Sequence, residues 1–240
     1  MQASARRQPG ARWAAALLAM LVMGAARGAD LQGSLGASSD NVFRGLSLSD
    51  EQPSLLADVH ASGTQWFGGV AADTVRLAPR ERTSAQLIGY LGYQYAWGPG
   101  LRSAWSVRHY DYVSSFRNRY DYDEVDATLS WQERLSVRLI GSPDTYQVSE
   151  YRRYGRGAAF AAELSGREPL PYALSVQLGA GYYDLRQEVG AGYVYWSAAL
   201  SEQWDAWSFT VSYIGTDAGA RRLFGPEADA RLVASAVWSF

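Results

Sequence analysis

Two histidines are the first residues of this sequence that could do chemistry. His60 and His109 each lie two residues from an aspartate, Asp58 and Asp111, so a carboxylate-assisted metal site is formally possible. The chain has two histidines and no cysteine in 240 residues, which is too few for a histidine-rich or thiolate metal centre. We therefore expect neither a metal nor another cofactor.

A serine lies close to the first histidine. His60 and Ser62 are two residues apart and would share one side of a β-strand. A lipase that works in a membrane needs such a nucleophile to face the lipid, with an orienting partner and an oxyanion donor. The alternation of the surrounding residues places this pair on the polar side, so we expect a polar lining, no catalytic residue and no enzymatic activity.

Four carboxylates cluster between residues 121 and 126. Asp121, Asp123, Glu124 and Asp126 could suggest calcium, which binds cages of oxygen ligands. On a regular strand the first two would point opposite to the last two, so one cage is not expected. We expect Glu124 and Asp126 to face an interior and the other two to lie near a loop. The sequence contains no phosphate-binding loop or dinucleotide fingerprint.

The composition fits one β-domain with dispersed apolar residues. Apolar residues make up 48% of the chain, yet the mean hydropathy is −0.22. The 16 tyrosines and 9 tryptophans are typical of membrane interfaces, and also of an aromatic-rich soluble sandwich. The net charge is −2 and no basic stripe is present, so no nucleic-acid partner is expected.

The N-terminus resembles a secretory leader. Arg6, Arg7 and Arg12 precede an apolar run from about Trp13 to Ala26, and small residues follow as far as Gly28. This order of basic, apolar and small residues is that of a signal peptide. The run is shorter than the roughly 20 apolar residues of a transmembrane helix. We predict a signal peptide over 1–28 and a mature domain over 29–240.

Beyond Asp30 the sequence repeats a pattern of about ten alternating residues followed by a break. In the last repeat Leu232, Ala234, Ala236 and Trp238 alternate with polar or small residues, which gives a strand one apolar face. The pattern predicts about twelve strands, centred near residues 35, 58, 70, 90, 106, 127, 138, 160, 177, 197, 211 and 235.

The connections between these strands differ in length. Those after even-numbered strands are short, at 63–64, 98–100, 133–134, 166–170 and 205–206. Those after odd-numbered strands are longer and more charged, at 40–52, 76–82, 114–119, 142–153, 185–191 and 217–227. Short turns at one end and long loops at the other are typical of bacterial outer-membrane barrels. The even strand count would place both chain ends on the short-turn, periplasmic side.

The aromatic residues favour a barrel over a soluble sandwich, whose apolar faces would meet in a core. They gather near the strand ends, where the girdles of a membrane barrel lie: Trp66, Tyr95, Trp97, Trp131, Tyr172, Tyr182, Trp207 and Trp238. The fold class we predict is all-β, a transmembrane antiparallel up-and-down β-barrel of about twelve strands.

The polar faces would then line a lumen of mixed charge. The inward positions are expected to include Asp58, His60, Arg102, Arg108, Glu124, Asp126, Arg138, Glu163, Gln177 and Arg231. Charge of both signs predicts no strong ion selectivity. Arg44, in the first long loop, could fold inward as a constriction or cap the first strand. Twelve strands leave less space than the 16 to 18 of open porins, so a narrow channel and a closed structural or surface-binding barrel both remain possible.

Two segments also resemble a known family. The opening Ser-Asp-Asn-Val-Phe-Arg-Gly-Leu-Ser over 39–47, followed by Gln-Pro-Ser-Leu over 52–55, resembles the TorF porin family, long catalogued as conserved hypothetical proteins of proteobacteria. Weaker matches run through the mature chain to its last residue. The chain departs from the family at Ala71-Ala72-Asp73, where an asparagine is common, and at 108–111.

The resemblance implies a location and partners rather than a substrate. It implies export to the outer membrane of a Gram-negative cell, contact with outer-membrane lipid, and passage of small solutes or ions. Phe240, which ends an alternating strand, resembles the signal by which such proteins engage the barrel assembly machinery. The family brings no established solute.

Overall fold

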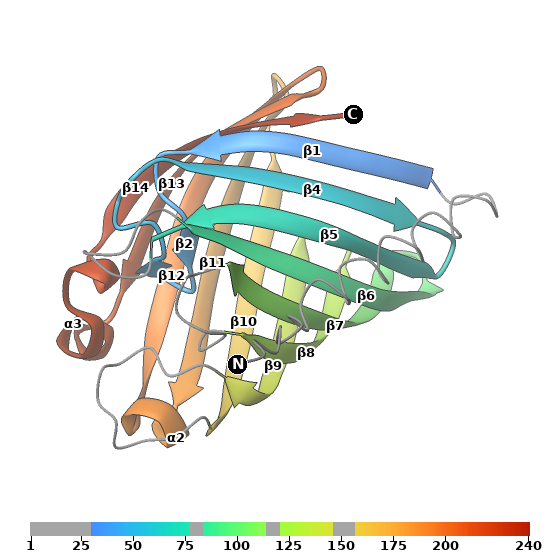
Figure 1. Ribbon diagram of the computed structural model, residues 1–240. Helices are drawn as coiled ribbons and strands as arrows, with labels where there is room; N and C mark the ends of the chain where they lie inside the picture. The colour runs from blue at the N-terminus through green and yellow to red at the C-terminus, as the bar shows by residue number, and fades with distance from the viewer. Residues whose placement is uncertain (1–29, 77–83, 114–120, 146–156) are drawn as a thin grey trace, which may run out of the picture.

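The computed structural model describes residues 30–76, 84–113, 121–145 and 157–240. Twelve long antiparallel strands form one closed barrel, in which the first strand pairs with the last (Figure 1). These strands are β1 (Asp30–Ser38), β4 (Ser54–Ser62), β5 (Trp66–Val75), β6 (Ser84–Gly98), β7 (Leu101–Val113), β8 (Tyr122–Trp131), β9 (Leu135–Thr145), β10 (Gly157–Pro169), β11 (Leu174–Leu185), β12 (Ala191–Trp204), β13 (Trp207–Thr216) and β14 (Arg231–Ser239). Each predicted strand centre falls inside one of them, so the predicted barrel is confirmed.

The apolar face of the sheet lies on the outside of the barrel. Leu55, Val125 and Leu200 are 65%, 55% and 48% exposed, as expected for side chains that meet acyl chains rather than a protein core. Their polar neighbours turn inward, and Glu124, next to Val125, is almost completely buried. Because the apolar side chains stand outside a single closed sheet, the sandwich alternative does not describe this chain.

Aromatic side chains gather at the end of the barrel where the short turns lie. Trp66 packs edge-on against Tyr93 at 4.9 Å between ring centroids, and Tyr93 stacks near Trp105 at 6.3 Å. The rings of Trp238 on β14 and of Phe240, which follows that strand, have centroids 4.8 Å apart. Rings with one apolar and one polar end suit the boundary between lipid and water, so this end of the barrel has the character of a membrane interface.

Phe240 closes the seam between the first and last strands. Its backbone N–H donates to the carbonyl of Gly33, and the N–H of Gly33 donates to the carbonyl of Phe240, both at 2.9 Å. A Cβ atom on Gly33 would lie 2.6 Å from Cζ of the phenylalanine ring. The glycine therefore makes room for the ring against β1.

The loops differ from the prediction in four places. β9 continues to Thr145 and β10 to Pro169, so the connections expected to start at 142 and 166 start later. Short helices occupy two connections expected to be irregular: α2 (Arg186–Val189), and α3 (Ala218–Phe224) followed by the 3-10 helix η1 (Gly225–Ala228). Helices of one or two turns are too short to show a periodic pattern in sequence.

Some predicted segments lie outside the described residues. These are the signal peptide over 1–28, the loop at 114–119, and most of the loops at 76–82 and 142–153. Among the described residues, no helix is both long enough and apolar enough to cross a membrane.

Candidate functional site

The first long loop folds into the barrel. It contains a small hairpin of β2 (Val42–Phe43) and β3 (Leu46–Ser47), and its turn holds Arg44 and Gly45 at φ values of 49° and 82°. A Cβ atom on Gly45 would lie 2.5 Å from Cγ2 of Thr216 and 2.9 Å from Cβ of Tyr195. The turn therefore lies directly against the inner wall of β12 and β13. Of the two positions left open for Arg44, the structure shows the inward one.

Arg44 is enclosed by charges and aromatic rings. Its side chain is 4% exposed, and Nη2 lies 2.8 Å from Oε1 of Glu124. Nε lies 3.9 Å from Oε1 of Glu163. The guanidinium carbon is 4.4 Å from the ring centre of Phe43 and 4.5 Å from that of Tyr183, a geometry favourable for cation–π attraction. The hairpin is thus held inside the barrel through its turn residue.

The guanidinium of Arg44 stays charged in this buried position. Burial alone would lower the pKa of Arg44, but the neighbouring carboxylate of Glu124 and the surrounding tyrosines raise it above its usual value. The turn is also held by its backbone, because Tyr193 donates a hydrogen bond of 3.0 Å from its hydroxyl to the carbonyl of Arg44.

The Arg44 ion pairs continue into a chain of alternating charges on one wall. Arg138 lies 3.8 Å from Glu163 and donates from Nε to Asp126 at 3.1 Å. Arg108 donates from Nε to the other oxygen of Asp126 at 3.2 Å. We call this set the charge ladder; it consists of Glu124, Arg44, Glu163, Arg138, Asp126 and Arg108. The charges of both signs that the sequence predicted for the lumen thus pair with one another along the wall and with the hairpin.

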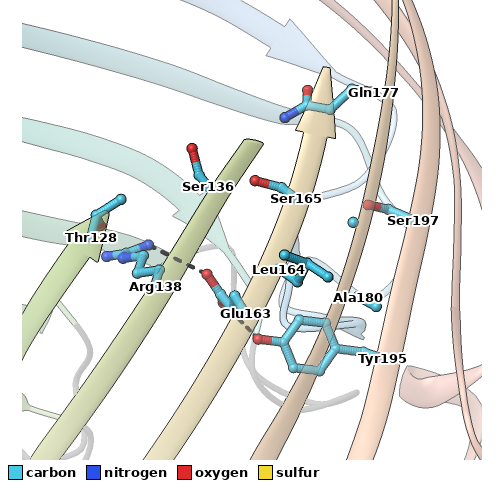
Figure 2. A pocket seen from close by; sticks show the side chains of 11 residues that line it. Thr128, Ser136, Arg138, Glu163, Leu164, Ser165, Gln177, Ala180, Tyr195 and Ser197 are labelled. Atoms are coloured by element: carbon cyan, nitrogen blue, oxygen red, sulfur yellow. Dashed lines mark hydrogen bonds and ion pairs between the residues drawn. The ribbon is translucent and has the colours of Figure 1, made fainter. Parts of the chain in front are cut away.

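A cavity of about 380 Å³ lies beside the charge ladder, on the inner wall of β8 to β12 (Figure 2). Its lining combines hydroxyl, amide and charged groups with small residues: Thr128, Ser136, Arg138, Glu163, Leu164, Ser165, Gln177, Gly179, Ala180, Tyr195 and Ser197. Cross-strand pairing explains why the hydroxyls form a row. Ser165 is paired with Ser136 on β9 and with Gly179 on β11, and Gly179 is paired with Ser197 on β12.

A glycine allows one tyrosine to reach the charge ladder. Tyr195 donates from its hydroxyl to Oε1 of Glu163 at 2.6 Å, although β11 lies between their two strands. The residue in between is Gly181, paired with both. A Cβ atom there would lie 2.4 Å from Cζ of Tyr195. The absence of a side chain lets the ring lie flat across β11, where Figure 2 shows it pointing toward Glu163.

A second polar group lies on another part of the inner wall. Nδ1 of His60 is 2.6 Å from Oδ1 of Asp58, and the hydroxyl of Tyr90 donates to Oδ2 of the same aspartate at 2.8 Å. The guanidinium of Arg108 lies 6.0 Å from the ring of Tyr90, so this group lies next to the end of the charge ladder. His60 therefore faces inward with an aspartate partner.

Two of the predicted lining residues lie at the ends of the barrel. Arg102 is 3.0 Å from Glu133 of the β8–β9 turn, and both side chains are largely exposed. Arg231 is 2.9 Å from Asp40 of the first loop. It also donates to the carbonyl of Pro226 at 2.7 Å, so it ties the first loop to η1. Neither arginine lies in the middle of the lumen.

The second histidine lies on the outer face. His109 is 2.8 Å from Asp123 of β8, and not paired with Asp111, the neighbour considered from sequence. Among the described residues, no group of three or more histidine, cysteine, aspartate or glutamate side chains is placed to hold a metal ion.

Sequence reasoning missed the inward tyrosines. Tyr110 and Tyr122 stack at 4.4 Å between ring centroids, and Tyr110 donates to Glu124 at 3.0 Å. Tyr193 contacts the hairpin from β12. The signal was present in the alternation, because each of these tyrosines lies next to an outward residue in sequence. The aromatic content drew attention to the outer girdle instead.

The chain forms a closed antiparallel β-barrel with a polar lumen, and its fold is similar to that of solved porins. Among solved structures, the chain is similar to the KdgM porin at a TM-score of 0.54 and 10% identity, covering 87% of this chain and 99% of that one. It is also similar to the KdgM porin in complex with disordered oligogalacturonate, at a TM-score of 0.56 and 9% identity, covering 88% and 99%. At these identities the likeness shows a shared fold.

The chain belongs to the Gcw_chp family, described as bacterial protein of unknown function. The family model matches residues 23–240, which includes every strand of the barrel. No curated protein matches the sequence.

Proposed function

We propose that this protein is an outer-membrane channel for passive diffusion of small polar solutes or ions, of the TorF type that its sequence resembles. The observation that carries the proposal is a closed barrel with apolar side chains outside and a hollow lined by polar and charged side chains inside. An apolar exterior is stable in lipid, and an aqueous polar interior is what a channel requires. The KdgM likeness supports the same architecture.

The proposed pathway has its narrowest section at the Arg44 hairpin. A solute would pass between this turn and the inner wall, along Asp58, His60, Arg108, Glu124, Asp126, Arg138, Glu163 and Gln177, with Arg102 and Arg231 at the two mouths. Three arginines and three carboxylates of the charge ladder balance one another, so strong selection by charge is not expected from that wall.

The proposal includes the location and the partners. The signal peptide over 1–28 would export the chain, outer-membrane lipid would contact the apolar band, and Phe240 would engage the barrel assembly machinery. The contact of Phe240 with Gly33 gives the same residue a second role in closing the barrel.

Planar-bilayer recording of the refolded protein tests the channel. We expect stepwise conductance, and a larger step for Arg44→Ala because the constriction loses its side chain. Neutralising two lining carboxylates together, Glu124→Gln with Asp126→Asn, should shift the reversal potential measured in a salt gradient in the direction of weaker cation preference. Unchanged reversal potentials would remove both residues from the ion path.

One observation favours a second candidate, a closed structural or surface-binding barrel. The hairpin, the inward tyrosines and helix α3 pack into a buried cluster that includes Leu46, Tyr183, Tyr193 and Ala220. If this packing seals the lumen permanently, the recordings will be flat for the wild type and for Arg44→Ala alike.

A further inference from the structure

We propose that the cavity on the β8–β12 wall is a binding subsite for an uncharged polyhydroxylated solute of about the size of one sugar ring. The inference rests on the proposed function, since a solute would reach the cavity through the lumen. It adds a preferred class of solute and the residues that recognise it.

The cavity offers hydrogen-bonding groups that are not used by the described residues of the barrel. Ser165, Ser197, Thr128 and Gln177 line it, and none of their side chains makes a hydrogen bond to another side or main chain in the part of the barrel that the structure describes. Hydroxyl and amide groups both donate and accept. Such a set is complementary to a ligand whose own groups do the same, which is the chemistry of sugar and polyol hydroxyls.

The charged groups at the edge of the cavity are already paired. Arg138 lies between Asp126 and Glu163, and Glu163 also accepts a hydrogen bond from Tyr195. An anionic ligand would have to compete with two carboxylates for one guanidinium, and would be repelled by both. A cationic ligand would have to compete with Arg138 for the carboxylates and would be repelled by its guanidinium. An uncharged ligand avoids both penalties and can still accept from the guanidinium N–H groups that the ladder does not use.

The shape of the cavity sets the size of the ligand. A volume of about 380 Å³ is that of about a dozen water molecules, which suits one monosaccharide ring. Gly179 lies at the centre of the hydroxyl row, and a Cβ atom there would approach Oγ of Ser197 to 3.0 Å. The glycine, paired with both Ser165 and Ser197, therefore keeps the floor between them open. The ring of Tyr195 at one side provides an apolar surface for the face of a sugar.

The test compares galactose with galacturonate, which have the same ring and differ in one carboxylate. Each sugar is titrated onto single channels of the full-length refolded protein in a planar bilayer. We expect galactose to reduce the conductance along a saturating curve, and galacturonate to require at least about a tenfold higher concentration. The double variant Ser165→Ala with Ser197→Ala should weaken the binding of galactose about tenfold, because two hydrogen bonds to the sugar are lost. Gly179→Leu should abolish saturation by filling the floor.

Ser201→Ala is the matched control. Ser201 is a lumen hydroxyl of the same strand β12, bonded to Thr210 at 2.9 Å and outside the cavity lining, so this variant should leave the galactose curve unchanged. Heat-modifiable migration in SDS gels verifies that each variant forms a barrel. If the double variant does not fold, the galactose curve of Gly179→Leu alone tests the subsite.

The outcomes separate this inference from the channel proposal. Conductance that falls linearly with either sugar, equally in wild type and variants, overturns the subsite and leaves the channel intact. Tighter binding of galacturonate overturns it as well, in favour of an acidic solute. If the protein does not conduct, calorimetric titration in detergent replaces the recordings. Galactose binding lost in Gly179→Leu then supports a subsite in a closed barrel, and absence of binding heat overturns it.

Discussion

Removing one partner of the Arg44–Glu124 pair should destabilise the barrel more than removing both. The two side chains are 4% and 1% exposed, and Nη2 and Oε1 are 2.8 Å apart. Arg44→Met keeps the length of the side chain and removes its charge, and Glu124→Gln keeps the shape and removes the negative charge. Each single variant leaves one buried charge without its opposite, whereas the double variant leaves neither.

The burial of the pair sets the magnitude. Breaking a buried ion pair by removing one partner costs about 3–5 kcal/mol, while replacing both charges with groups of similar volume is often neutral. Glu163 lies 3.9 Å from Arg44 and compensates part of the charge when Glu124 is neutralised. We therefore expect the free energy of unfolding to fall by about 4 kcal/mol in Arg44→Met and by about 3 kcal/mol in Glu124→Gln, and by less than either in the double variant.

The assay is urea unfolding of the refolded protein in detergent micelles, followed by tryptophan fluorescence. The pair Arg134–Glu168 provides the control, because it lies 3.3 Å apart with both side chains more than half exposed. Exposed pairs contribute about 0–1 kcal/mol, so the same cycle there should show little coupling. If the effects of Arg44→Met and Glu124→Gln are small and simply add, the hairpin is not held by this pair and our reasoning about the constriction fails.

Three further predictions concern the wall, the loops and the lipid face. Gly181→Ala should lower the free energy of unfolding by about 1.5–3 kcal/mol, the cost of a lost charged hydrogen bond, whereas Gly141→Ala, where a Cβ meets nothing within 4 Å, should change it little. Backbone N–H groups lower the pKa of Asp217, although burial alone would raise it; this cap of α3 is therefore stabilising above the ordinary pKa of about 3.9 and is lost as the pH falls through the lower folded value. Asp217→Ala should lower the free energy of opening of the first turn of α3 by about 1 kcal/mol at pH 7, which amide hydrogen exchange measures as faster exchange. The difference between the variant and the wild type should vanish in acid. Val211→Arg on the outer face should cost about 2–4 kcal/mol in a bilayer, and Ser212→Arg, on the inner face of the same strand, much less.

The barrel could be predicted from the sequence because each strand is a local pattern. Alternation along β8 assigns Val125 and Leu129 to one face and Glu124 and Asp126 to the other, with no knowledge of the neighbouring strands. The contrast between short and long connections then indicated that consecutive strands are neighbours in an up-and-down barrel. Antiparallel neighbours joined by tight turns leave few other ways to arrange such a sheet.

The position of the first loop could not be predicted in the same way. Arg44 meets Glu124 and Glu163, which are far away in the sequence and on different strands. The alternation of a strand says nothing about the direction of a loop, so an inward hairpin and a cap on β1 were equally compatible with the residues. Gly45 adopts a left-handed conformation in the turn, but in the sequence it is only a glycine after an arginine, which does not specify the direction of the turn.

The connectivity of the charge ladder indicates how the lumen could open. Arg44 is the only member of the ladder that lies on a loop, and the other five lie on β7, β8, β9 and β10. Within the ladder, moving the hairpin therefore breaks only the contacts of Arg44, while Arg138 stays bonded to Asp126 and close to Glu163. Four charges of the wall, those of Arg108, Asp126, Arg138 and Glu163, remain paired without the hairpin. Among the charged groups, the cost of opening falls mainly on Glu124, which loses its ion pair but keeps the hydrogen bond from Tyr110 and would gain water as the hairpin leaves. The rest of the cost is the apolar packing of Leu46 against Tyr183 and Tyr193.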